Sequence, residues 1–60
     1  MKVYRIWDTN LNQWHKGGTG KTIWANLSGA RSVIRSRIKY KLPHEHLQIH
    51  EFTLQFNAVV

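Results

Sequence analysis

The chain has 60 residues, a formal net charge of +6 at pH 7 and no cysteine. A chain of this length forms a single domain, here residues 1–60, and buries only about 60% of the surface that its unfolded form exposes. The sequence contains no apolar run near the roughly 18 residues of a membrane span, and no signal-peptide pattern opens it. We therefore expect a soluble intracellular domain without a membrane partner. Because its core is thin and lacks disulfides, we also expect a homodimer.

The N-terminal half contains two candidate strands. Residues 2–7 are rich in β-branched and aromatic side chains, which predicts a strand, and residues 8–12 are turn formers. Residues 13–15 can resume an extended conformation, and residues 22–25 form the second candidate strand. Pairing of residues 22–25 with residues 2–7 would give a hairpin with a long, glycine-rich connection.

Apolar residues between positions 30 and 42 follow the period of a helix. Asn26 or Ser28 can cap this helix, and Pro43 must end it because proline lacks a backbone N–H. The apolar stripe on one face consists of Ala30, Val33, Ile34, Ile38 and Leu42.

The C-terminal part alternates between apolar and polar residues, but the phase changes. Leu47 and Ile49 are apolar at odd positions, whereas the later apolar residues stand at even ones: Phe52, Leu54, Phe56 and Ala58. This change predicts either a β-bulge near His50 and Glu51 or two short strands with separate partners. The chain as a whole predicts an α+β fold, in which an N-terminal hairpin and one or more C-terminal strands pack on one amphipathic helix.

Positive charge is concentrated in the middle of the chain. Residues 21–41 contain six lysines or arginines and no acidic residue. Such a segment attracts phosphates or an acidic protein surface, although excess charge can also serve only to keep a small protein soluble. On the predicted helix, Arg31, Arg35 and Lys39 lie on one face, which Arg37 and Lys41 widen.

Residues 16–22 read K-G-G-T-G-K-T. This segment resembles the variant phosphate-binding loop of partition ATPases, and that resemblance implies phosphate contacts by Lys16 and Lys21. His15 stands where the ordinary loop has its first glycine, however, and 60 residues cannot supply the several βα units of that fold. We interpret the resemblance as coincidental. The loop is either an anion-binding nest or a hairpin connection.

Histidines and tryptophans are the remaining candidates for chemistry. His44, His46 and His50 are compatible with a metal site, but their spacing is more typical of solvated side chains, and we expect no metal or cofactor. No Ser/His/Asp or Cys/His set is present, so we expect no enzyme activity. One or two of the three tryptophans should fill the core. Trp14 is the one we expect to be exposed, where it could anchor a partner or stack on bases.

Scattered motifs give a second resemblance: Tyr4-Arg5-Ile6-x-Asp8, then Lys16-Gly17-Gly18, Lys21-x-x-Trp24, Leu27 and Arg31. Together they resemble short accessory proteins of tailed bacteriophages. That resemblance implies a protein that acts stoichiometrically in the bacterial host cytoplasm, where it would block a host enzyme or immune effector or sequester its nucleotide signal.

Three functions follow as hypotheses. The first is a non-enzymatic phage protein that inhibits a host protein with an acidic surface, such as a component of antiviral defence. The second is nucleic-acid binding through the basic helix face. The third is a nucleotide sponge, in which the glycine loop and Trp24 hold a phosphate ligand between subunits. The candidate binding residues are Trp14, Lys16, Lys21, Trp24, Arg31, Arg35, Arg37 and Lys39.

Overall fold

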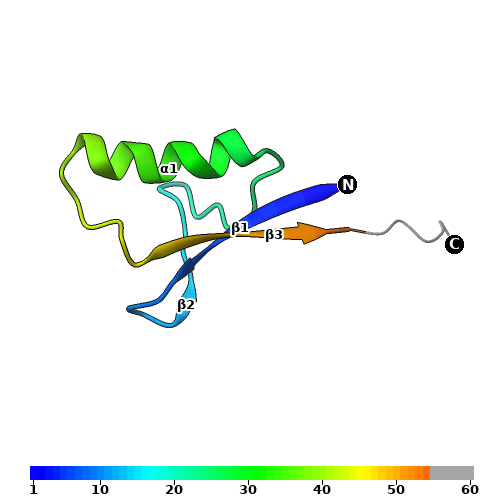
Figure 1. The fold of residues 1–60 in the computed structure, drawn as a ribbon, viewed down its shortest axis with the longest axis horizontal. Helices are drawn as coiled ribbons and strands as arrows, with labels where there is room; N and C mark the ends of the chain where they lie inside the picture. The colour runs from blue at the N-terminus through cyan, green and yellow to red at the C-terminus, as the bar shows by residue number, and fades with distance from the viewer. Residues whose placement is uncertain (55–60) are drawn as a thin grey trace, which may run out of the picture.

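The computed structural model describes residues 1–54 and confirms the α+β fold. Its elements are β1 (Lys2–Asp8), β2 (Gln13–Trp14), α1 (Leu27–Lys39) and β3 (Leu47–Thr53). The strands form an antiparallel sheet in the order β2-β1-β3. Helix α1 lies along one side of this sheet, and the segment after β2 runs up to the helix before turning back to the strands (Figure 1). Within residues 1–54, no helix is long and apolar enough to cross a membrane.

The N-terminal hairpin pairs β1 with β2, so the predicted pairing with residues 22–25 is wrong in all but one position. Trp7 lies opposite Trp14, and the turn closes early because the Asp8 carboxylate accepts the backbone N–H groups of Asn10 and Leu11, both at 2.9 Å. Residues 22–25 contribute a single bridge. In that bridge Trp24 exchanges backbone hydrogen bonds of 2.8 and 2.9 Å with Tyr4.

Strand β3 pairs with β1 residue by residue, from Asp8 opposite Leu47 to Lys2 opposite Thr53. The predicted bulge near His50 and Glu51 is therefore wrong, as is the alternative of two strands with separate partners. The phase of the apolar residues changes because both faces of the sheet carry apolar groups, so that Leu47 lies on one face and Phe52 on the other. Phe56 and Ala58 lie outside the described residues.

The core lies between α1 and the sheet. Ile6, Trp24, Ala30 and Leu47 are buried, and Tyr4, Val33, Ile34 and Ile49 pack around them. Only the first half of the predicted apolar stripe reaches this core, because the side chains of Ile38 and Leu42 are 51% and 48% exposed.

Helix α1 begins as predicted and ends early. Asn26 is the N-cap residue, although its side chain makes no capping hydrogen bond. The helix stops at Lys39 rather than at Pro43, because Lys41 adopts a left-handed conformation with φ 55°. The backbone N–H groups of Lys41 and Leu42 then donate to the carbonyls of Ile38 and Arg37 at 3.0 and 2.8 Å. This pair of bonds is a Schellman motif, which closes the helix without proline.

Candidate binding site on the open face of the sheet

Side chains of β1 alternate between the two faces of the sheet. Tyr4, Ile6 and Asp8 face α1, whereas the intervening residues face away from it. We call this second side the open face. It carries Val3, Arg5 and Trp7 from β1, Trp14 from β2, and Gln48, His50 and Phe52 from β3.

Trp14 lies at the centre of an aromatic cluster on the open face. Its ring centroid is 4.9 Å from that of Trp7, 5.5 Å from that of His50 and 5.7 Å from that of Phe52. All three contacts are edge-to-face, with interplanar angles of 77°, 90° and 67°, an arrangement favoured by the quadrupole of aromatic rings. Trp14 is therefore half-buried rather than fully exposed, and the cluster holds its side chain in place.

Arg5 completes the cluster with a positive charge. Its guanidinium carbon lies 4.2 Å from the centroid of the Trp14 ring, a cation–π contact. The Nε atom of Arg5 is buried and has no hydrogen-bond partner among the described residues. An arginine so fixed is a partly desolvated cation, and an anion brought to this face interacts with it more strongly than with a fully hydrated one.

Carboxylates are absent from the open face, as far as residues 1–54 define it. Asp8 and Glu51 lie on the helix side and Glu45 lies in the loop before β3. Each carboxylate has a basic side chain beside it: Lys2 Nζ lies 3.6 Å from Glu51, His46 Nε2 3.6 Å from Asp8, and His44 Nε2 3.9 Å from Glu45. The basic and aromatic groups of the open face are therefore left for a ligand.

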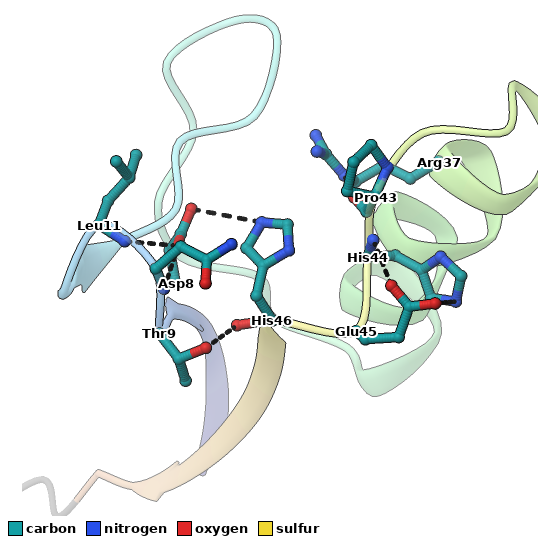
Figure 2. Close-up of polar contacts among 9 residues, drawn as sticks. Asp8, Thr9, Leu11, Arg37, Pro43, His44, Glu45 and His46 are labelled. Atoms are coloured by element: carbon teal, nitrogen blue, oxygen red, sulfur yellow. Dashed lines mark hydrogen bonds and ion pairs between the residues drawn. The ribbon is translucent and has the colours of Figure 1, made fainter.

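The buried Asp8 carboxylate organises the hairpin that carries Trp14 (Figure 2). The backbone N–H of Leu11 lowers the pKa of Asp8, helped by the N–H of Asn10 and by the positive charge of His46 when protonated, while desolvation opposes them. Nearby, the Thr9 hydroxyl donates to the carbonyl of His46 at 2.9 Å. These contacts tie the β1–β2 turn to the start of β3.

The predicted basic helix face is only partly present. Arg31, Arg35 and Lys39 are exposed on α1 and make no ion pair within the described part of the chain. Arg37 does not belong with them, because its half-buried side chain folds toward Pro43 and its Nε donates to the Pro43 carbonyl at 2.6 Å (Figure 2). Lys41 stands in the turn after the helix.

The glycine-rich loop has its own hydrogen bonds. The N–H of Gly17 donates to the Lys21 carbonyl and that of Gly20 to the Gly17 carbonyl, both at 2.8 Å. Lys16 and Lys21 are exposed at the ends of this turn. Helix α1 begins only at Leu27, so the loop does not lead directly into a helix as a phosphate-binding loop does.

Trp24 lies in the core with 5% of its surface exposed, so the structure does not offer it as the ligand contact that a nucleotide sponge requires. Lys21 Nζ lies 6.0 Å from the centroid of the Trp24 ring. The three candidate histidines lie apart: His44 beside Glu45, His46 beside Asp8, and His50 on the open face. Over residues 1–54 no group of three metal-binding side chains comes together.

Sequence reasoning found Trp14 but missed its neighbours Arg5, Trp7, His50 and Phe52. The period-two alternation of Val3, Arg5 and Trp7 in the first strand was a signal that could have placed these three on one face. The β3 residues required the register, which no local pattern supplies. No known protein family matches the chain, and no curated protein or solved structure is significantly similar to it.

Proposed function

We propose that this protein is a non-enzymatic binding protein whose open face binds single-stranded nucleic acid. The observation that carries the proposal is the contact of Arg5 with Trp14, at the centre of an aromatic cluster that has no carboxylate beside it among residues 1–54. Aromatic rings and arginine planes on a sheet are the surfaces on which unpaired bases stack.

A single strand suits this face better than a duplex does. The bases of a duplex are already stacked on one another, whereas a single strand can offer its bases to Phe52, Trp7 and the Arg5 guanidinium. Arg31, Arg35 and Lys39 lie on the helix, on the other side of the sheet. They contribute long-range attraction for a polyanion rather than contacts at the site.

The test is a titration with an oligothymidylate of about 12 nucleotides, a length within the range that single-strand-binding domains cover. Trp7 and Trp14 report binding directly, because a base that stacks on the cluster quenches indole fluorescence. We expect the affinity to fall steeply as salt increases, since each phosphate contact releases counterions.

Two variants with the same change of charge locate the site. Arg5→Gln should weaken binding by about tenfold or more, the equivalent of a contact of about 1.4 kcal/mol. Arg31→Gln removes one charge on the opposite side and should have a much smaller effect. Circular dichroism melts of both variants confirm that they fold. Equal losses in the two variants, or no quenching at low salt, would contradict the proposal.

A second candidate function is inhibition of a host protein with an acidic surface, through the same face. It is favoured by the side chains present, because tryptophan and arginine dominate interface hot spots, and by the half-buried, edge-to-face packing of the rings. Two results together would favour this candidate over the first. One is a host protein that crosslinks to the wild type and to Arg31→Gln but not to Arg5→Gln. The other is that the wild type does not bind oligothymidylate.

A further inference from the structure

A hollow of about 350 Å³ lies between the glycine-rich loop and α1. His15, Gly17 and Gly18 line it from the loop side, and Ser32, Ser36 and Arg37 line it from the helix. It lies on the helix side of the sheet and shares no residue with the open face, so the two sites can be tested separately.

The groups around the hollow suit an anion. Within the part of the chain that the structure describes, Arg37 and His15 are its two basic side chains and no carboxylate lines it. The bond from Arg37 Nε to the Pro43 carbonyl, 2.6 Å long, holds the guanidinium in place. Its two terminal nitrogens make no further hydrogen bond with residues 1–54 and remain as a pair of donors, the geometry that recognises two phosphate oxygens at once.

The other groups that line the hollow leave space for a ligand and offer it one hydroxyl group. The hydroxyl of Ser32 already donates to the Gly29 carbonyl at 2.6 Å, which leaves Ser36 as the hydroxyl donor for a ligand. A Cβ atom built on Gly18 would meet nothing within 4 Å, so the space above the loop is open. The volume exceeds that of a phosphate ion and leaves space for a small group attached to it.

We propose that this hollow binds a phosphate group, either as the inorganic ion or as the monoester of a small molecule, with Arg37 as the main contact and His15 and Ser36 as further donors. This site differs from a phosphate-binding loop, because the charge comes from the helix and the backbone N–H groups of Gly17 and Gly20 are engaged within the turn.

The pKa of His15 depends on the charges around it, so it can report phosphate binding in the hollow. Burial lowers the pKa of His15, and the positive charge of Arg37 lowers it further, with a smaller contribution from His46, whereas Asp8 raises it. A phosphate dianion beside His15 adds negative charge and must raise this pKa. Protonated His15 is in turn favoured by the ligand, so a shift of the His15 titration curve to higher pH when phosphate is added reports binding at this site.

The experiment follows the His15 ring and the Gly17 and Gly18 amides by NMR during titrations with inorganic phosphate and, separately, with adenosine monophosphate. We expect saturable shifts of these three residues and a higher His15 pKa in the bound state. Tighter binding of adenosine monophosphate would assign the monoester as the ligand, and equal or weaker binding would assign the free ion.

Two variants of α1 provide the matched comparison. Arg37→Gln should reduce the affinity at least about tenfold, because it removes a charge-assisted bidentate contact. Lys39→Gln changes the charge equally on the exposed side of α1 and should have a much smaller effect. If Arg37→Gln destabilises the turn at Pro43, Ser36→Ala is the second variant and should weaken binding while the fold stays intact. Absence of saturable His15 shifts at millimolar phosphate, or equal effects of Arg37→Gln and Lys39→Gln, would overturn the proposal.

Discussion

The guanidinium carbon of Arg5 lies 4.2 Å from the centroid of the Trp14 ring, and the two residues belong to neighbouring strands of the sheet. The contact places a cation directly over an aromatic face that α1 does not cover. It also explains why Trp14 is half-buried although it follows a polar turn.

Arg5→Met separates the structural role of this contact from its role in binding. Methionine keeps an apolar stem on Trp14 but removes the charge and the buried, unpaired Nε. Loss of the cation–π contact costs about 0.5–2 kcal/mol, and removal of the unpaired donor recovers about 1–3 kcal/mol. We therefore expect the melting temperature to stay level or rise while oligothymidylate binding is lost. A marked fall in melting temperature would show that Arg5 serves the fold instead.

The stability of the protein should depend on the ionisation of Asp8. Hydrogen bonds from the N–H groups of Leu11 and Asn10 lower the pKa of Asp8 in the folded state, so its contribution is fully present above the pKa of the unfolded chain. That contribution is lost as the pH falls from about 4 toward the lower folded pKa. Melts between neutral and strongly acidic pH should show this loss in the wild type and a weaker pH dependence in Asp8→Asn. If the melting temperatures of the two proteins change equally with pH, the ionisation of Asp8 does not contribute to stability in this way.

Lys41→Gly should stabilise the protein. Lys41 has φ 55° at the end of the Schellman motif, a conformation that costs a residue with a Cβ about 1 kcal/mol more than glycine. For a domain of this size, a gain of about 1 kcal/mol raises the melting temperature by roughly 4–8 °C. Lys39→Gly, in the last turn of α1, is the control and should lower it, because glycine there only weakens the helix.

Gly29→Ala tests the packing of Trp24 against α1. Alanine in a helix is favoured over glycine by about 0.8–1.0 kcal/mol, so propensity alone predicts a gain. A Cβ on Gly29 would lie 3.2 Å from Cδ1 of the buried Trp24, however, and the indole must shift to accept it. We expect the clash to cancel the gain, with no rise in melting temperature and an altered Trp24 emission. A full gain with unchanged emission would show that the added Cβ fits without displacing the indole.

Self-association is the fifth expectation. The outer edge of β3 pairs with no other strand among residues 1–54, and Phe52 and Leu54 at its end are 37% and 49% exposed. If two copies join at this edge, mass action makes the melting temperature rise with protein concentration, which can be measured over about a hundredfold range. Sedimentation equilibrium gives the stoichiometry. A melting temperature independent of concentration, with a monomer mass, would rule the dimer out.

Local patterns were enough to predict β1, the start of α1 and the layer arrangement. Residues 2–7 carry strand formers, and the early part of the stripe, Ala30 to Ile34, does face the core. The end of α1 was missed because proline is an obvious stop signal, whereas a lysine in a left-handed conformation has no sequence signature. The open face was missed because two of its strands, β1 and β3, are separated by residues 9–46, and only their register brings Arg5 opposite His50.

The first residue and the end of the last strand are tied together, because the N–H of Leu54 donates to the carbonyl of Met1 at 2.7 Å. Strand β1 is thus synthesised well before its main partner, since one whole edge of it waits for residues 47–54. Contacts so distant in sequence slow folding, and the nascent chain cannot close its sheet while it is still being extended through α1. The pairing of β1 with β3 therefore forms only once residues 47–54 are present, and truncation within β3 should leave β1 without its main partner rather than leave a smaller stable domain.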